Sequence, residues 1–198
     1  MQFFHEKQDL GLIDSDIWYY PHFLNHQEAN NYFKHLKEHT PWRQDNIKVF
    51  GKVYAQPRLT ALYGNNEKTY SYSNIQMEPL PFSQDLLQLK KLVDKEVGTE
   101  FTSCLLNLYR DGKDSNGWHS DNEDELGKNP IIASISLGEE RFFHLRHKSD
   151  KTLKHKIRLE HGSMLLMKGS TQHFWQHQIA KTSKKIEERI NLTFRIIR

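Results

Sequence analysis

Short stretches in which apolar and polar residues alternate dominate the second half of the chain. A period of two is typical of β-strands that bury one face. Strands are predicted at residues 101–109, 131–137, 141–146, 156–160, 163–167, 174–179 and 189–197, separated by turns such as RDGKDSNG, LGEE and EHG. Seven short strands at such intervals indicate an antiparallel sandwich or barrel.

Two amphipathic helices are predicted in the first half. One begins after Asn25, with Glu28 placed to complete a capping box, and runs to residue 39. Its apolar face comprises Ala29, Tyr32, Phe33 and Leu36. The other begins at Ser83, ends at Gly98, and has an apolar face that comprises Leu86, Leu89, Val93 and Val97. The fold class is therefore α+β, with a jelly-roll-like core and the helices on one outer face of a sheet.

Residues 47–82, between the helices, are rich in aromatic residues, β-branched residues and turn formers, which indicates hairpins. We find no repeat, low-complexity tract or linker, and 198 residues suit one domain with a substantial core. We therefore expect a single domain, 1–198, in which 1–46 form an N-terminal helical extension and 101–198 form the strand-rich core.

Composition indicates the cellular compartment of the protein but does not identify its chemistry. Charged residues make up 27% and the net charge is +3, which permits binding to nucleic acid but does not require it. The single cysteine, Cys104, excludes a disulfide framework and favours a reducing compartment. Early charges argue against a signal peptide, and no apolar run reaches membrane-spanning length. We expect a cytoplasmic protein, or a nuclear one in a eukaryote, without a membrane partner.

A candidate metal site begins in GWHSDNED, residues 117–124. His119 and Asp121 are two positions apart, so in an extended segment both side chains project to the same side. A second histidine would complete a facial triad of two histidines and one carboxylate, which leaves open positions and is typical of non-haem Fe(II) oxygenases. Zinc would tolerate these ligands too, but zinc sites more often recruit further His or Cys.

The third ligand is not settled by spacing. His177 lies on a predicted strand, and His173 lies four residues before it, on the same face if the whole segment is extended. Other downstream histidines compete as well, and they are His144, His147, His155 and His161. An H-x-D tripeptide also occurs by chance in proteins that bind no metal.

The strand RINLTFR, residues 189–195, has an unusual polar side. Its apolar side, suited to a core, comprises Ile190, Leu192 and Phe194; the polar side comprises Arg189, Asn191, Thr193 and Arg195. If the polar side faces inward, two guanidiniums without acidic partners need an anion. At about 3.3 Å per residue the two arginines are about 20 Å apart, so they would bracket a two-ended dianion, or one would bind its far carboxylate while the other works near the metal. 2-Oxoglutarate fits this description.

Six motifs follow one another along the chain, and they are N-L-Y-R-D-G at 107–112, W-H-S-D at 118–121, S-I-S-L-G at 134–138, H-G-S-M-L-L-M at 161–167, W-Q-H at 175–177 and R-I-N-L-T-F-R at 189–195. In this order they resemble the AlkB family of Fe(II)- and 2-oxoglutarate-dependent dioxygenases. The resemblance covers residues 47–198. It implies a double-stranded β-helix core, and it implies an enzyme that uses Fe(II), O2 and 2-oxoglutarate to remove alkyl lesions from nucleic-acid bases.

The resemblance also assigns roles to residues. It implies that His119, Asp121 and His177 bind iron, preferring His177 because the family's distal histidine follows a Trp-x pair. Further residues are implied to bind 2-oxoglutarate, with Arg189 at the distal carboxylate and Arg195 toward the metal; the full set is Asn107, Tyr109, Arg189, Asn191 and Arg195.

The segment VFGKVYAQPRLTALYGN, residues 49–65, resembles the branch of the family that repairs double-stranded DNA. There the resemblance implies that Phe50 intercalates at the base step vacated by the flipped nucleotide, although a phenylalanine in a hairpin also packs in a core. Residues 47–82 would form a nucleotide-recognition lid with Arg58 as a polar contact and Tyr70 or Tyr72 stacking on the damaged base. Asn122 follows Asp121 where an acidic pair is expected, so Glu123 would take over contact with a cationic base.

These implications add up to a monomeric DNA oxidative demethylase. Its targets would be 1-methyladenine and 3-methylcytosine in double-stranded DNA, and its products would be the restored base, formaldehyde, succinate and CO2. One alternative keeps the chemistry and changes the substrate to RNA or single-stranded DNA. The other is a damage-binding module with an inactive metal site.

Overall fold

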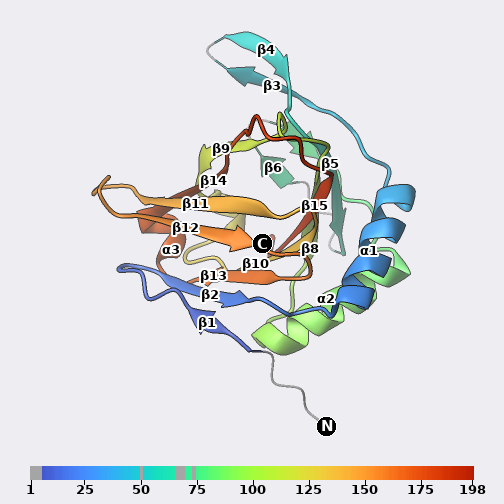
Figure 1. The fold of residues 1–198 in the computed structure, drawn as a ribbon, viewed down its shortest axis with the longest axis horizontal. Helices are drawn as coiled ribbons and strands as arrows, with labels where there is room; N and C mark the ends of the chain where they lie inside the picture. The colour runs from blue at the N-terminus through green and yellow to red at the C-terminus, as the bar shows by residue number, and fades with distance from the viewer. Residues whose placement is uncertain (1–5, 50, 66–69, 73–74) are drawn as a thin grey trace.

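The computed structural model describes residues 6–49, 51–65, 70–72 and 75–198. Two antiparallel sheets face each other across a common core (Figure 1). The larger has the order β1 (Gln8–Asp9), β2 (Asp16–Tyr20), β13 (Met164–Lys168), β10 (Ile132–Gly138), β15 (Arg189–Arg195), β8 (Ser103–Tyr109), β5 (Leu59–Gly64). The smaller has the order β12 (Lys154–Leu159), β11 (Arg141–His147), β14 (Trp175–Ile179), β9 (Asn116–His119). This jelly roll confirms the predicted fold class.

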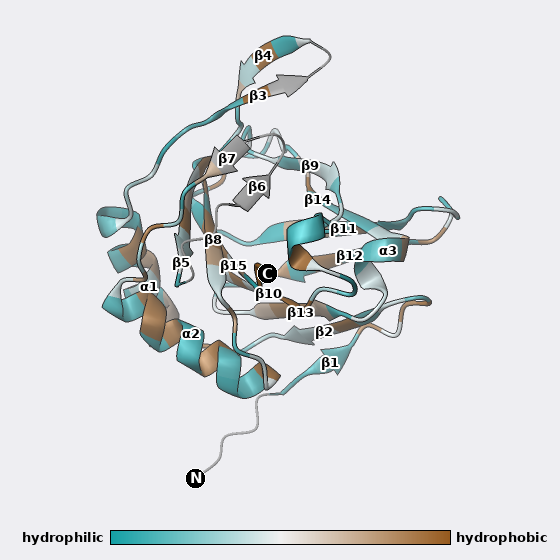
Figure 2. Cartoon of the chain, turned by 180° about the vertical axis from the view of Figure 1, so that it is seen from behind, coloured by the Kyte–Doolittle hydropathy of each residue, from teal (hydrophilic) through white to brown (hydrophobic). Residues whose placement is uncertain are grey.

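Two helices cover the outer face of the larger sheet (Figure 2). Helix α1 (His26–His39) has the predicted capping box, in which Asn25 accepts from the Glu28 backbone and Glu28 accepts from the Asn25 backbone. Helix α2 (Gln84–Val97) is capped by Ser83 and ends at Gly98, whose φ of 69° is accessible to glycine at little cost. Among the described residues, no helix is both long enough and apolar enough to cross a membrane.

The segment between the helices forms the predicted hairpins. β3 (Asn46–Val49) pairs with β4 (Lys52–Ala55) and protrudes from the body, whereas β6 (Tyr70–Tyr72) pairs with β7 (Ile75–Met77) nearer to the sheets (Figure 2). Two short helical turns complete the chain, the 3-10 turn η1 (Asp124–Leu126) and α3 (Thr171–Phe174).

The larger sheet draws strands from all three predicted parts of the chain. β2, within residues 1–46, pairs with β13, and β5, within residues 47–82, pairs with β8. The first segment is therefore more than a helical extension. The pattern DIWYY does not predict strand β2, because its five mostly aromatic residues show little alternation of apolar and polar positions. Its partner strand β13 lies 144 or more positions away in the sequence.

Strand β15 shows how the fold separates two environments. All seven of its residues are buried. Ile190, Leu192 and Phe194 pack in the cluster beneath the helices, and the polar side chains line the cavity between the sheets. The polar side of RINLTFR thus faces inward, the condition under which its guanidiniums need an anion.

Candidate metal centre and anion pocket

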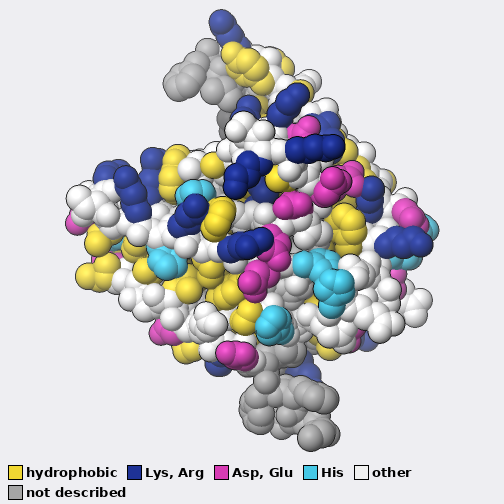
Figure 3. Space-filling view, viewed as in Figure 1, with side chains coloured by type: hydrophobic (Ala, Val, Ile, Leu, Met, Phe, Trp, Pro, Cys, Tyr) yellow, Lys and Arg dark blue, Asp and Glu magenta, His cyan; other side chains and the backbone are white. Residues whose placement is uncertain are grey.

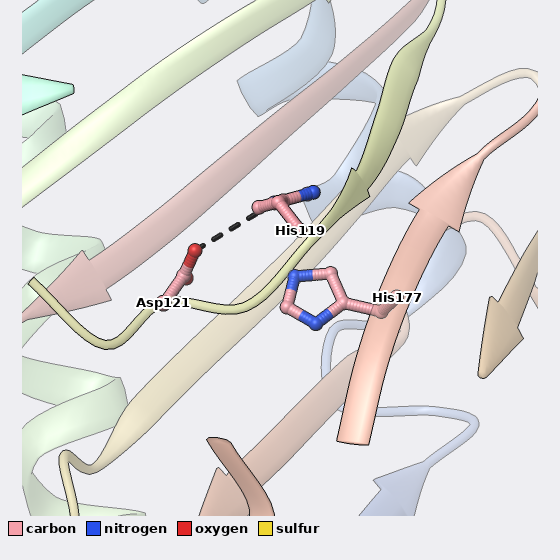
Figure 4. Close-up of side chains that lie close together, drawn as sticks. All are labelled: His119, Asp121 and His177. Carbon is pink, nitrogen blue, oxygen red and sulfur yellow. Dashed lines mark ion pairs between the residues drawn. The ribbon is translucent and has the colours of Figure 1, made fainter. Parts of the chain in front are cut away.

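Three side chains at one end of the cavity form a candidate metal centre. His119 is the last residue of β9, Asp121 follows it, and His177 lies on β14, directly opposite His119 in the strand register. One ligand atom from each lies within 4.8 Å of the others, and Figure 4 shows the three side chains converging. The structure therefore brings together the H-x-D pair and a histidine 56 positions later, and this histidine is His177, the one that the family resemblance implied.

The local structure leaves suitable atoms facing the centre. His119 Nδ1 lies 2.7 Å from the Gly117 carbonyl oxygen, so a proton on Nδ1 leaves Nε2, which lies 3.2 Å from Asn116 Nδ2, unprotonated and able to bind a metal. The backbone of Asp121 is held by its N–H, which donates to Gln172 Oε1 at 2.9 Å. Gln172, on α3, was not singled out from the sequence, because nothing local links it to Asp121.

The competing His173 points elsewhere. It lies in the helical turn α3 and is exposed, and its Nε2 lies 2.8 Å from Asn129 Oδ1. The predicted extended segment therefore begins only at Trp175, and His173 and His177 do not share a strand face.

Electrostatics keep the candidate ligands in the forms that bind metal. Burial lowers the pKa of His119 and, with the nearby His119, lowers the pKa of His177 to about 3, so both imidazoles are neutral at pH 7. Burial raises the pKa of Asp121, but the charge of Arg195 and its hydrogen bond to the carboxylate outweigh this effect and hold the pKa well below its usual range. A carboxylate and two neutral imidazoles result.

Asp121 uses one of its two oxygens in a buried ion pair. Arg195 donates from Nη2 and Nε to Oδ2 at 2.6 and 3.1 Å. Oδ1 lies 3.6 Å from His119 Nε2 and has no hydrogen-bond partner among the described residues. An unpartnered carboxylate oxygen beside two neutral imidazoles fits a divalent cation, and Arg195 lies at the metal end, where the sequence placed it.

The other arginine of β15 lies in a different environment. Arg189 is 1% exposed, and its Nη2 donates to Ser136 Oγ at 2.9 Å. Its Nε and Nη1 are buried without a hydrogen-bond partner in the part of the chain that the structure describes. Burial lowers the pKa of Arg189 to about 10, so the guanidinium remains charged at pH 7. Two unsatisfied charged donors in a cavity fit a carboxylate.

The neighbours of Arg189 come from the strands on either side. Tyr109 is directly opposite it on β8, with the guanidinium carbon 5.2 Å from the ring centre. Arg141, on β11 of the smaller sheet, also lies near this ring, with its guanidinium carbon 5.9 Å from the ring centre. It donates hydrogen bonds to the carbonyl oxygens of Asp114 and Ala180. Arg141 and Ser136 were not predicted, since a buried arginine at a strand start looks like any exposed one in sequence.

A chain of amides connects the remaining candidates. Arg58 donates from Nε to Asn107 Oδ1 at 2.8 Å, and Asn107 Nδ2 lies 3.5 Å from Asn191 Oδ1. Asn191 in turn donates to Ser134 Oγ at 2.7 Å. Asn107 and Asn191 face each other across β8 and β15, so their contact follows from strand register. Arg58 thus lies in the cavity beside the predicted cosubstrate contacts.

The cavity lies between the two sheets, and side chains from both of them line it. The three candidate metal ligands, the two arginines of β15 and the residues Arg58, Asn107, Tyr109 and Asn191 all line it. Its apolar wall comprises Leu105, Phe143, Leu159, Met167 and Ile179. Polar groups suited to an anion and a metal are therefore sheltered by apolar side chains.

The remaining candidates lie in or near the lid. Phe50 lies outside the described residues, and Tyr70 and Tyr72 are placed on β6 with their side chains undescribed. Glu123 is two residues beyond Asp121, directly before η1. It is not among the described residues that line the cavity.

Comparisons with known proteins match most of the chain. The family model for the 2OG-Fe(II) oxygenase superfamily matches residues 16–195, which include β2 as well as the catalytic motifs. Alpha-ketoglutarate-dependent dioxygenase alkB homolog 3 from Bos taurus is 45% identical over 186 residues, covering 89% of this chain and 64% of that protein. The human protein of that name is 43% identical, covering 92% and 66%. The chain thus spans just under two thirds of these relatives.

DNA oxidative demethylase ALKBH2 from Arabidopsis thaliana is 37% identical over 220 residues, covering 96% of this chain and 68% of that protein. Among solved structures, OsALKBH1 has a TM-score of 0.65 at 18% identity, covering 96% of this chain and all of that one. At that identity the structural likeness supports the fold alone.

Proposed function

Because the chain belongs to the 2OG-Fe(II) oxygenase superfamily and, within it, to the AlkB dioxygenases, we propose that it is an oxidative demethylase of alkylated DNA. For a methylated base the reaction consumes O2 and 2-oxoglutarate and yields the restored base, formaldehyde, succinate and CO2. One observation carries the proposal: a triad of His119, Asp121 and His177 shares a cavity with Arg189, whose guanidinium has two unsatisfied donors.

Each residue has a distinct proposed duty. When bound, Fe(II) and 2-oxoglutarate would supply the activation of O2 and the oxidation of the N-alkyl carbon. His119, Asp121 and His177 would hold the metal, and Arg195 would fix the Asp121 carboxylate through Oδ2 while leaving Oδ1 free for the ion. Arg189 would bind the distal carboxylate of 2-oxoglutarate, with Ser136 orienting the guanidinium.

The rest of the cavity would position the substrate. Asn107, Asn191 and Tyr109 form the wall beside the anion, and Arg58 reaches from the lid side to Asn107, so it links the nucleotide site to the cosubstrate site. Phe50, Tyr70, Tyr72 and Glu123 would contact the flipped nucleotide from residues 47–82 and the loop after Asp121. Phe143 and Ile179 would keep water from the alkyl carbon.

The names of the relatives support alkylated DNA as the substrate, since several ALKBH2 proteins are called DNA oxidative demethylases. We propose 1-methyladenine and 3-methylcytosine as lesions and a monomeric enzyme without an obligate protein partner, in the compartment that holds its DNA. A direct assay tests this: incubation with Fe(II), 2-oxoglutarate, O2 and a DNA that contains 1-methyladenine should yield succinate and restored adenine. Metal and 2-oxoglutarate binding without any turnover would contradict the proposal in favour of a damage-binding module.

Arg189→Ala should raise the 2-oxoglutarate KM on the order of 100-fold, because it removes the charged partner of a buried carboxylate. The Kd for 2-oxoglutarate, measured without turnover, should rise in parallel, and Arg189→Lys should restore part of the loss. Arg110→Ala removes a guanidinium whose side chain is 41% exposed and pairs with Asp114, and it should leave the KM unchanged. An unchanged cosubstrate dependence in Arg189→Ala would mean that the anion binds elsewhere.

Phe50→Ala tests the preference for duplex DNA. If Phe50 fills the space left by the flipped base, the activity of the variant on a duplex should fall about 5- to 100-fold. A fall of this size is expected from the loss of one stacking contact. Activity on the same lesion in a single strand should change little. Equal losses on both substrates, or no loss on either, would favour the single-stranded DNA or RNA alternative.

A further inference from the structure

Positive charge is concentrated on one hairpin of the smaller sheet. Residues 141–159, which span β11 and β12, hold seven of the 28 Lys and Arg residues but only one of the 25 Asp and Glu residues. The rest of the chain holds 21 Lys and Arg residues and 24 Asp and Glu residues, so its net charge is −3. The net charge of +3 therefore arises from this hairpin alone, although the proposed reaction uses none of its exposed cations.

The strand register places these cations on the outer surface of the sheet. Along β11, Phe143 and Leu145 are buried while Phe142, His144 and Arg146 point outward. Their partners on β12 are Arg158, Lys156 and Lys154, all of which are exposed. We call these six residues the outer basic face: Phe142, His144, Arg146, Lys154, Lys156 and Arg158. Figure 3 shows this side, with Lys and Arg gathered around apolar and His side chains.

Aromatic rings are interleaved with the cations. Lys156 Nζ lies 3.7 Å from the centre of the Phe142 ring, and that side chain is 45% exposed. The guanidinium of Arg146 lies 4.1 Å from the Trp118 ring. An exposed phenylalanine contributes little to the stability of the fold. Its ring does offer a surface on which an unpaired base can stack, and the neighbouring ammonium groups can pair with phosphate.

Edge strand β9 connects the outer basic face to the candidate active site. His119 lines the cavity, whereas its neighbour Trp118 lines a hollow on the outer surface together with His144, Arg146, Lys154 and Lys156. Successive residues of a strand point to opposite sides, so only the thickness of β9 separates the metal centre from this hollow. A DNA strand that crosses β9 from the metal centre to the outer surface would next meet Trp118 and Arg146.

We propose that the outer basic face binds the unpaired DNA strand that flanks the nucleotide in the active site. The inference rests on the proposed function and names a second contact region for the same substrate. Lysine ammonium groups at every second position of β12 would follow the phosphates, and Phe142 and Trp118 would stack on bases. Two acidic residues, Glu139 and Glu140, line the adjoining hollow, and Glu140 pairs with Arg158 rather than with Lys154 or Lys156, the two cations proposed to meet the polyanion.

The test compares binding of an unmodified 25-nucleotide single strand with turnover of a trinucleotide that contains 1-methyladenine. The double variant Lys154→Gln/Lys156→Gln should reduce the slope of log Kd against log salt for the long strand by about 1.4, or about 0.7 per lost phosphate contact. Phe142→Ala should weaken binding about 5-fold or more at any salt. Neither variant should change turnover of the trinucleotide, which is too short to reach the face.

A matched pair of lysines on the opposite side serves as control. Lys91→Gln/Lys95→Gln removes the same charge from the exposed side of α2 and should change neither slope nor affinity. Equal slopes in both double variants would overturn the proposal, as would weakened binding of a 25-base-pair duplex with unchanged binding of the single strand. If the trinucleotide is not demethylated, the proposed function fails, while the binding data on the long strand still decide the role of the face.

Discussion

His177→Ala should abolish turnover and strongly lower the affinity for a divalent metal. Loss of a residue that only hydrogen-bonds to a metal ligand lowers metal affinity roughly 10- to 100-fold, and loss of the ligand His177 should lower it by well over that factor. His177 supplies one of three ligand atoms that converge within 4.8 Å, and its neutral imidazole has no substitute among the described His, Cys, Asp and Glu side chains that cluster there. Metal affinity is measured with Mn(II) by equilibrium dialysis, and turnover is measured as succinate formed. Circular dichroism reports whether the variant is folded.

The control is the histidine that competes with His177 in the sequence. His173→Ala removes an exposed imidazole that contacts Asn129, so metal affinity and turnover should both stay at the level of the parent protein. Loss of metal binding in His173→Ala, with binding retained in His177→Ala, would assign the metal to a site other than the cavity between the sheets.

Arg195→Met should destabilise the metal-free protein by about 3–5 kcal/mol at pH 8, because it leaves the Asp121 carboxylate buried without its cation. The side chains of the pair are only 6% and 2% exposed, so solvent screens little of the interaction. For a domain of this length the loss corresponds to a fall in Tm of about 6–20 °C. Differential scanning calorimetry at pH 8, where His119 and His177 are neutral, measures it.

Mn(II) gives this prediction a second readout. A divalent cation at Asp121 would replace the lost positive charge, so saturating Mn(II) should raise the Tm of Arg195→Met more than that of the parent protein. Arg158→Met breaks the ion pair with Glu140, whose side chains are 62% and 30% exposed, and it should cost about 1 kcal/mol or less. A loss in Arg195→Met no larger than in Arg158→Met would mean that the buried pair does not stabilise the site.

Features that depend on neighbours along the chain were predictable from the sequence. The capping residues Asn25, Ser83 and Gly98 are confirmed because a cap acts within one helical turn. The polar side of β15 follows from a period of two, and so does the convergence of His119 with Asp121. The family motifs added the choice of His177, which periodicity alone left open.

Features that depend on pairing between distant segments were not predictable. Gln172 holds the Asp121 backbone across 51 positions, and Ser136 meets Arg189 across 53. Arg141 is buried because its guanidinium reaches the carbonyls of two loops, although an arginine in a sequence is expected to be exposed. Each contact exists only once the register between strands is fixed.

The sequence by itself determined a jelly roll with two covering helices, an H-x-D pair and a strand with an anion-binding side. The tertiary structure decided the partners of the two arginines: Arg195 pairs with Asp121, and two donors of Arg189 have no hydrogen-bond partner among the described residues. It also placed the excess positive charge on one outer face. The physical reason is that side-chain direction is set by local backbone geometry, whereas the partner that a side chain meets is set by how sheets pack.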